Sequence, residues 1–256
     1  MIQQKAGSLM KSTITLFLSS MILFAACKKE DEPAPTPTPT PILQGIVDID
    51  SNRYDTLTIG GLTWFTENLQ VTRFNNGDTI PFDTGNAFWV NSTPYCTVLD
   101  NDMDNKSIYG LLYNWGANYD VRGLCPVGWH PSTDADWGVL ELALGMDSAE
   151  VTMNSWPNYG ARGIAANVAG KLKSLQLWAI LDSVTNSSGM SVLPARSRNP
   201  QQGGFTSSNS AYYWTPGGSS DWYRAIGDGL AGVIRRAPGQ SSDTPGAGYS
   251  CRCVMD

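Results

Sequence analysis

Cysteine is the residue type with the clearest chemical role in this sequence, and Cys27 is the first to consider. It follows Lys11 and an apolar stretch that runs from Ile14 to Ala26 and ends in two alanines. This pattern is typical of a secretory signal peptide that ends at a lipidated cysteine. The apolar stretch is shorter than the roughly 20 residues that a membrane-spanning helix needs. We predict a signal peptide over residues 1–26 and acyl chains on Cys27; the alternative is an ordinary signal peptide with an incidental cysteine.

Four further cysteines, Cys96, Cys125, Cys251 and Cys253, fall in the part of the chain that would be exported. An even number of cysteines in an exported domain predicts two disulfides. Cys251 and Cys253 are two residues apart on an expected strand, so their side chains share a face and should reach different partners. The expected pairs are Cys125–Cys253 with Cys96–Cys251, or the crossed alternative. A metal site is the competing interpretation, but it needs two close cysteine pairs or more than one histidine.

Three carboxylates at alternate positions, Asp100, Asp102 and Asp104, come just before an expected helix. Carboxylate oxygens at this spacing can wrap a Ca²⁺ ion, so the loop is a candidate calcium site. It is not an EF-hand, because Asn105 stands at the position of the turn glycine and Leu111 at that of the bidentate glutamate. The alternative interpretation is a polar loop that caps the helix.

His130 is the only histidine of the chain, and it lies between Trp129 and Pro131. A histidine can act as a general base near neutral pH. No nucleophile motif such as G-x-S-x-G accompanies it, so we interpret His130 as a packed residue that hydrogen-bonds a loop carbonyl. The sequence therefore predicts no catalytic residue.

The residues from Cys27 to Ile42 are predicted to form a tether. Prolines alternate with alanine or threonine from Pro33 to Pro41. Alternating prolines fix φ and remove backbone donors, which predicts an extended stalk of roughly 40 Å from Lys28 to Pro41. The charged run Lys28–Glu32 resembles the export signal that follows the lipidated cysteine of Bacteroidetes surface lipoproteins. That resemblance implies the outer face of the outer membrane, where the lipid anchor is the only expected contact with the membrane.

The composition bounds the class of residues 43–256, which are long enough for one domain with a single core. The chain has a net charge of −6, and only three lysines follow the tether, at positions 106, 171 and 173. An acidic surface of this kind repels nucleic acid, so we exclude nucleic-acid binding. The nine tryptophans and 26 glycines favour a domain with long loops and short strands over a helical bundle.

Periodicity predicts the elements that must position these residues. Strands are expected on either side of the Gly60-Gly61 turn, and an apolar stripe at helical spacing predicts a helix from Asn105 through Trp115. A capping box at Thr133 starts a second helix, and a third is expected near residues 163–174. Later strands are predicted at 190–195, 212–215, 222–226, 233–236 and 249–255. Helices in the middle and strands at both ends predict an α+β domain whose terminal strands pair in one sheet.

Several motifs, taken in order along the chain, resemble the Fibrobacter succinogenes major paralogous domain family. They are Ile59–Trp64 with Glu67–Leu69, Tyr109–Trp115, Cys125–Pro131, Ala169–Lys173, Leu193–Ala195 and Ser250–Cys253. The sequence departs from the family pattern where Pro131 follows His130 directly, and where Cys251 replaces the usual valine. The second departure supports a bond between Cys251 and Cys96 in this subgroup.

The resemblance implies a bacterial surface lipoprotein with a fold related to C-type lectin-like domains, and it implies no established activity. We expect a non-enzymatic binding module for a glycan or a protein, or else a structural or adhesion component of the envelope. An enzyme on a scaffold like that of the sulfatase-modifying factors is disfavoured, because the four cysteines are expected in disulfides. The calcium-dependent lectin motifs Glu-Pro-Asn and Trp-Asn-Asp are absent. Glycan binding would then use exposed aromatic residues, with candidates at Trp156, Tyr159, Tyr212 and Trp222.

Overall fold

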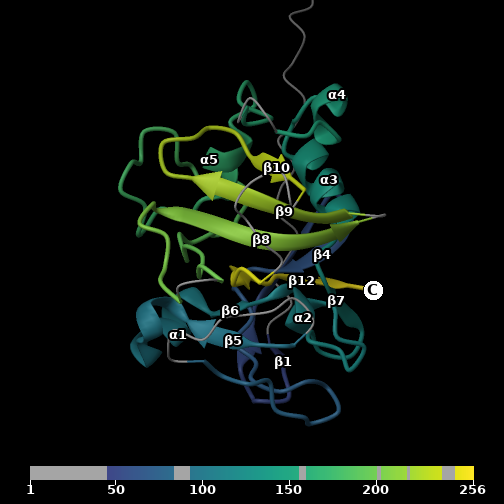
Figure 1. The fold of residues 1–256 in the computed structure, drawn as a ribbon. Helices are drawn as coiled ribbons and strands as arrows, with labels where there is room; N and C mark the ends of the chain where they lie inside the picture. Colours follow the sequence, from purple (N-terminus) through teal and green to yellow (C-terminus); the bar gives the residue numbers. More distant parts are fainter. Residues whose placement is uncertain (1–44, 84–92, 156–159, 201–202, 218–219, 238–245) are drawn as a thin grey trace, which may run out of the picture. The chain divides into compact units, whose positions relative to one another are not determined.

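The computed structural model describes residues 45–83, 93–155, 160–200, 203–217, 220–237 and 246–256 of the chain (Figure 1). The expected signal peptide over residues 1–26, Cys27 and the expected tether over residues 27–42 lie outside this range. The described residues form an α+β domain that is built mostly from short strands, with few helices.

A four-stranded antiparallel sheet joins the two ends of the domain. Its order is β3-β4-β12-β7, made of β3 (Thr56–Ile59), β4 (Leu62–Phe65), β12 (Cys253–Met255) and β7 (Trp129–Pro131). Gly60 and Gly61 connect β3 to β4 with φ of 62° and 87°, values that a two-residue hairpin turn requires and that glycine adopts freely. Val254 pairs with Trp64, so the predicted pairing of the terminal strands is confirmed.

A six-stranded sheet has the order β10-β9-β8-β11-β6-β5. Its strands are β5 (Cys96–Val98), β6 (Leu111–Tyr113), β8 (Ser210–Gly217), β9 (Ser220–Gly227), β10 (Ile234–Arg236) and β11 (Tyr249–Ser250). All neighbours are antiparallel except β11 and β8. The strands β1 (Ile46–Val47) and β2 (Arg53–Tyr54) pair with each other as a separate two-stranded sheet.

The helices are short. They are the 3₁₀ turns η1 (Leu99–Asn101) and η2 (Met103–Asn105), and the α-helices α1 (Lys106–Tyr109), α2 (Trp115–Asn118), α3 (Asp134–Ala143), α4 (Ser148–Val151) and α5 (Val168–Leu172). The predicted capping box of α3 is confirmed: Asp136 donates its backbone N–H to Thr133 Oγ1, and its carboxylate accepts the Thr133 N–H. This exchange satisfies two backbone donors that a helix start would otherwise leave unpaired.

The main core lies between α3 and the two sheets. Trp137 of α3 meets Trp64 of β4 edge-on with ring centroids 5.8 Å apart, and its centroid is 5.3 Å from that of Tyr213 in β8. A second core surrounds the cysteines and includes Tyr54 and Phe65, whose rings stack at 4.6 Å. The C-terminal segment from β11 to β12 passes from one sheet to the other, so it ties the two cores together.

The predicted helix from Asn105 through Trp115 is wrong. The helical turn α1 ends at Gly110, whose φ is 75°, and Leu111 starts strand β6. All three residues of β6 are buried, because β6 lies between β5 and β11 inside the sheet. A central strand that is apolar on both faces shows no alternation, and its leucines fit the helical spacing by coincidence.

Two strand predictions also need correction. Residues 190–195 form no strand; Val192 makes only an isolated parallel bridge with Lys173. The predicted strand 249–255 is two strands in different sheets, separated at Cys251 and Arg252. The predicted third helix is confirmed in position but is shorter, over Val168–Leu172. The strands predicted in the region 212–236 are confirmed, and β8 and β9 are longer than expected.

Candidate functional site

A cleft of about 420 Å³ opens where β4, α1, the loop after α5 and the C-terminal segment meet. Three residues that follow or join strands form its polar part, namely Glu67, Asn68 and Arg252. Three aliphatic side chains line it as well, Ile108, Leu177 and Leu193. Asp55, Ser174, Gln176 and Ser191 contribute further hydrogen-bonding groups. Such a mixture of apolar wall and convergent polar groups is typical of a ligand site.

Arg252 is fixed at the inner end of the cleft, with 1% of its surface exposed. Its Nε donates to Asn68 Oδ1 at 3.0 Å, and its Nη1 donates to Met190 O at 2.7 Å and Phe65 O at 3.2 Å. Asn68 is held in turn, because its Nδ2 donates to Tyr109 O at 2.8 Å. The guanidinium is therefore positioned by amide and carbonyl oxygens. Within the described residues no ion pair neutralises it, so a buried positive charge faces the cleft.

Glu67 is the carboxylate of the cleft. Its Oε2 accepts a hydrogen bond from the Asp55 N–H at 3.0 Å. Burial raises the pKa of Glu67, and the positive charge of Arg252 only partly offsets this effect. A half-buried carboxyl with a raised pKa beside a buried cation is the kind of group found at binding and catalytic sites.

Two residues of the cleft have strained backbones. Leu177 has φ of 69° and Ser191 has φ of 49°, in the left-handed region that L-residues avoid. Ser191 is stabilised by Asn186, whose Oδ1 accepts the Ser191 N–H at 3.0 Å. Leucine cannot compensate in this way, and such a conformation costs on the order of 1–3 kcal/mol. The surrounding structure therefore holds Leu177 in place at the wall of the cleft.

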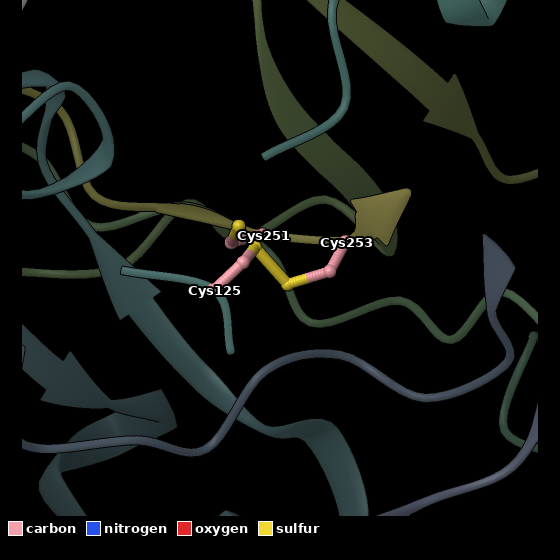
Figure 2. Close-up of side chains that lie close together, drawn as sticks. All are labelled: Cys125, Cys251 and Cys253. Atoms are coloured by element: carbon pink, nitrogen blue, oxygen red, sulfur yellow. A yellow bond between two sulfur atoms is a disulfide. The ribbon is translucent and has the colours of Figure 1, made fainter. Parts of the chain in front are cut away.

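The predicted disulfide between Cys125 and Cys253 is confirmed, and it links residues 128 apart (Figure 2). The second disulfide is wrong: Cys96 and Cys251 are free and buried. Cys96 lies on β5, and Cys251 follows β11, with β6 between them. Two strand spacings separate the backbones by roughly 10 Å, beyond the roughly 7 Å that a disulfide can bridge.

The sulfurs of Cys125, Cys251 and Cys253 all lie within 4.8 Å of one another. Three convergent thiolates could hold a soft metal ion, but a disulfide consumes two of these sulfurs. Burial also raises the pKa of the Cys251 thiol, so this group stays protonated. The three cysteines are therefore a structural disulfide, Cys125–Cys253, and one adjacent unreactive thiol, that of Cys251.

The structure does not bring the carboxylates of the expected calcium loop together. Asp100 pairs with Arg196 Nη1 at 2.8 Å, and Asp102 accepts the Asp104 N–H at 3.0 Å as the cap of η2. Within the described part of the chain, the cysteine trio is the only group of three or more candidate ligands that converges. Calcium binding by Asp100, Asp102 and Asp104 stays a prediction, and it would require the ion to displace Arg196.

His130 contacts two carboxylates and not the loop carbonyl that the sequence predicted. Its Nδ1 lies 2.7 Å from Asp256 Oδ1, and its Nε2 lies 3.1 Å from Asp136 Oδ2. Partial burial favours the neutral ring, but the hydrogen bonds to the two carboxylates outweigh it and raise the pKa of His130. The histidine thus joins β7 to the start of α3.

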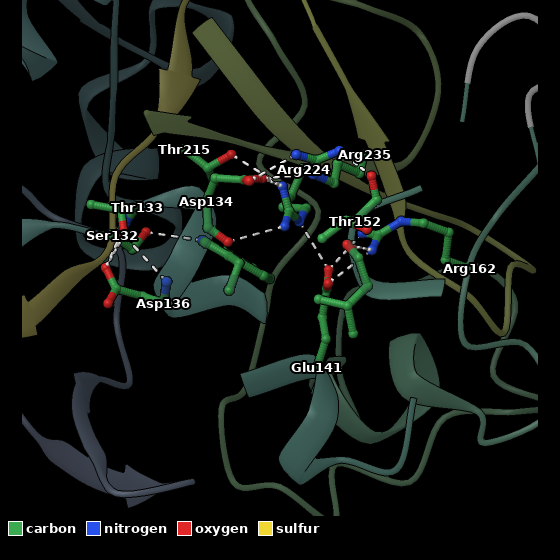
Figure 3. Close-up of polar contacts among 12 residues, drawn as sticks. Ser132, Thr133, Asp134, Asp136, Glu141, Thr152, Arg162, Thr215, Arg224 and Arg235 are labelled. Carbon is green, nitrogen blue, oxygen red and sulfur yellow. Dashed lines mark hydrogen bonds and ion pairs between the residues drawn. The ribbon is translucent and has the colours of Figure 1, made fainter. Parts of the chain in front are cut away.

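A second set of charges lies largely inside the domain, where its acidic and basic groups pair with one another (Figure 3). Glu141 of α3 accepts from Arg162 Nη2 at 2.7 Å and from Arg224 Nε at 2.9 Å. Asp134 accepts from Arg224 Nη1 at 2.6 Å and Arg235 Nε at 2.7 Å. These bonds fasten α3 to β9 and β10.

The two proposed sugar-stacking residues that the structure describes, Tyr212 and Trp222, do not line the cleft. Tyr212 stacks on Tyr249 at 5.3 Å, and Trp222 lies beneath the guanidinium of Arg235 at 3.5 Å. Both are partly buried in the face of the large sheet. Trp156 and Tyr159 lie outside the described residues.

The sequence did not single out Glu67, Arg252 and Leu177 as site residues. The sequence did contain a signal for Glu67 and Arg252. Both are polar residues next to buried strands, and both lie in the motifs Glu67–Leu69 and Ser250–Cys253. Leu177 carried no signal, since an exposed leucine in a left-handed backbone leaves no pattern in the sequence.

The model of the Fibrobacter succinogenes major domain matches residues 57–255. The chain belongs to this family. Searches of the curated proteins and of the solved structures found no match. All the lining residues of the cleft except Asp55 fall inside the matched range of the Fibrobacter succinogenes major domain. No helix among the described residues of the domain is both long and apolar enough to cross a membrane.

Proposed function

We propose that this chain is a lipid-anchored protein of the outer membrane, displayed on the cell surface, whose domain is a non-enzymatic binding module for a glycan or a protein. The single observation that carries the proposal is the cleft. It combines a buried guanidinium, an amide and a carboxylate with an aliphatic wall. Such groups bind a ligand that both donates and accepts hydrogen bonds and covers apolar surface.

The fold is proposed to be C-type-lectin-like. Short, mainly antiparallel strands, few helices and the Cys125–Cys253 disulfide support this assignment. Long irregular segments connect these elements and supply most of the cleft, including residues 174–193. Loops on a rigid scaffold are where binding residues are usually found.

The location rests on the signal-peptide pattern, Cys27 and the proline-rich tether. A stalk would let the cleft reach ligands beyond the lipid headgroups. Mass spectrometry of the N-terminal peptide tests the anchor: an acylated Cys27 is expected, and an unmodified residue 27 contradicts it. Protease treatment of intact cells tests display, since a surface domain is cleaved while a periplasmic one is protected.

One observation favours an enzyme as a second candidate. Asp55 and Glu67 line the same cleft, and a carboxyl with a raised pKa can act as a general acid. The described lining contains no cysteine, histidine or lysine that could serve as a nucleophile. Binding is the better supported function, because the groups of the cleft are placed for contact with a ligand and no activated nucleophile accompanies them.

The test uses the soluble chain that starts at Lys28, applied to a glycan array and to a displayed library of random peptides. Both are run with calcium and again with a chelator. Reproducible binding to one class is expected, and Glu67→Gln should weaken it about tenfold, as the loss of a charged hydrogen bond predicts. Asp78→Asn, which alters a carboxylate outside the cleft, should leave it unchanged.

Four outcomes are informative. Loss of binding on chelation would implicate the loop from Asp100 to Asp104. Binding that Glu67→Gln does not weaken would move the site away from the cleft. Chemical conversion of the bound glycan or peptide would favour the enzyme. Blank arrays from a folded sample would contradict the binding module and favour an envelope component.

A further inference from the structure

The segment from Ser174 to Leu181 combines one anchor with several exposed aliphatic side chains. Trp178 is 5% exposed and donates from Nε1 to Val192 O at 2.9 Å, so it fixes the segment to the core. Around it, four large aliphatic residues remain in solvent. They are Leu175, Leu177, Ile180 and Leu181, with 59%, 48%, 48% and 49% of their surface exposed.

The backbone holds these side chains outward. Leu177 is kept at positive φ, and the Ile180 N–H donates to Asp228 Oδ1 at 2.9 Å. Leu177 and Ile108 both line the cleft, and Leu177 shares its segment with three other exposed aliphatic residues, so aliphatic side chains occur both in the cleft and on the outside of the segment. Exposed aliphatic side chains gathered in one segment of a folded domain indicate an interaction site.

The charges next to this surface are acidic. Asp55 and Glu67 line the cleft, and Asp182 and Asp228 flank the segment. The nearby cations are Arg252, which lines the cleft and donates to amide and carbonyl oxygens, and Lys173, whose buried Nζ donates to Leu230 O at 2.8 Å. Four carboxylates against these two cations leave the surface acidic on balance, so a partner that complements it carries positive charge.

These features distinguish among ligand classes. No aromatic side chain appears among the described residues that line the cleft, so a sugar ring would find no stacking platform there. The acidic groups repel an anionic lipid surface. Aliphatic side chains beside hydrogen-bonding groups instead resemble the centre of a protein–protein interface.

We infer that the ligand of the cleft is a polypeptide segment that presents aliphatic side chains next to a lysine or arginine. The aliphatic side chains cover Leu177 and its exposed neighbours, and the basic side chain reaches Glu67. This inference rests on the proposed function, in which the cleft is the binding site. It deepens that function by naming the partner class.

The probe is a phage-displayed library of random dodecapeptides, selected on the soluble chain that starts at Lys28. Selected peptides are synthesised and titrated by calorimetry against the wild type and Leu177→Asn. Asparagine tolerates the left-handed backbone better than leucine, so the melting temperature should stay or rise while the aliphatic contact is lost. The matched control is Val121→Asn at a fully exposed valine outside the cleft.

Peptides with aliphatic and basic residues should be selected, and Leu177→Asn should lower their binding affinity about tenfold or more. Leu175→Ser, at another exposed position, should also lower this affinity, which keeps the test valid if Leu177→Asn fails to fold. Peptides that bind Leu177→Asn and Leu175→Ser as tightly as wild type would overturn the inference.

A glycan array and neutral or anionic phospholipid vesicles form the comparison arms. Glycan or vesicle binding that Glu67→Gln weakens, with no peptide selected, would overturn the polypeptide class and leave the cleft as a binding site. Absence of binding in all arms would sink the proposed function itself.

Discussion

Two clusters of charge occupy this domain, and they are built in opposite ways. In the network around α3, Glu141 is fully buried, and its carboxylate accepts hydrogen bonds from two guanidinium groups. In the cleft, Arg252 is just as buried, but its guanidinium is held by carbonyl and amide oxygens. Glu67 stands near it without forming an ion pair and remains partly exposed.

The difference separates a structural cluster from a site. Charges that neutralise each other inside the protein leave no capacity for a ligand, and they fix the elements that carry them. Charged groups that are positioned by neutral groups, and that have no ion-pair partner in the protein, can still interact strongly with a ligand that enters the cleft. The two clusters should therefore respond differently when one carboxylate is replaced by its amide.

The largest effect is expected for Glu141→Gln. The change leaves Arg162 and Arg224 with one buried negative charge fewer, and breaking a buried ion pair costs about 3–5 kcal/mol. Urea denaturation followed by tryptophan fluorescence should show this loss of unfolding free energy. Asp78→Asn, at an exposed pair with Arg122, serves as the control and should change stability little. A Glu141→Gln variant as stable as wild type would show that the network does not fasten α3.

Much of the fold follows from local signals in the sequence. The hairpin around Gly60-Gly61 and the capped start of α3 at Thr133 rest on local residue chemistry that the tertiary structure keeps. The pairing of the terminal strands is a long-range contact, and it follows from the order of the predicted elements. The Leu111–Tyr113 strand could not be recognised, because a strand buried on both faces has no alternation and here imitates helical spacing.

The cleft was not predictable as a site. Its groups come from segments far apart in the chain, and Arg252 reaches it only because the C-terminal segment crosses between the sheets. The cysteine pairing shows the same limit. Counting predicts two bonds, whereas the strand order separates Cys96 from Cys251 and permits only Cys125–Cys253.

A smaller effect, of opposite sign, is expected for Glu67→Gln. Burial raises the pKa of Glu67, so the folded protein binds this proton more tightly than the unfolded chain does. The stabilisation that comes from binding this proton is fully present below the pKa of Glu67 in the unfolded chain, about 4.3. It is lost as pH rises through the higher pKa of Glu67 in the folded protein. At neutral pH the amide should leave stability unchanged or raise it by less than about 1 kcal/mol, after screening by solvent.

The measurement is a pair of urea titrations at pH 4 and pH 7 on wild type and Glu67→Gln. The difference in stability between the two proteins should shift in favour of the variant at the higher pH. A clear loss of stability at pH 7 would show that Glu67 is fastened like Glu141, and that the contrast between the two clusters is wrong.

A comparably small effect concerns His130, which is held between two carboxylates as Arg224 of the network is but is partly exposed. A ring that donates from both nitrogens is positively charged. Because the pKa of His130 is raised, its contribution to stability is fully present below the unfolded pKa of about 6.5 and is lost as pH rises through the folded value. His130→Asn should therefore destabilise the protein at pH 5.5 by up to about 1 kcal/mol and have less effect at pH 9.

Thermal unfolding at the two pH values measures this difference, and Asp256→Asn separates its sources. That variant removes the 2.7 Å contact to Nδ1 and leaves Asp136 in its capping box. If the pH dependence comes from the charged ring, Asp256→Asn should reduce it while the stability at pH 9 stays near wild type. If His130→Asn lowered the stability equally at both pH values, His130 would act through packing alone. Its contacts with Asp136 and Asp256 would then resemble the network around α3 in their packing and not in their charge.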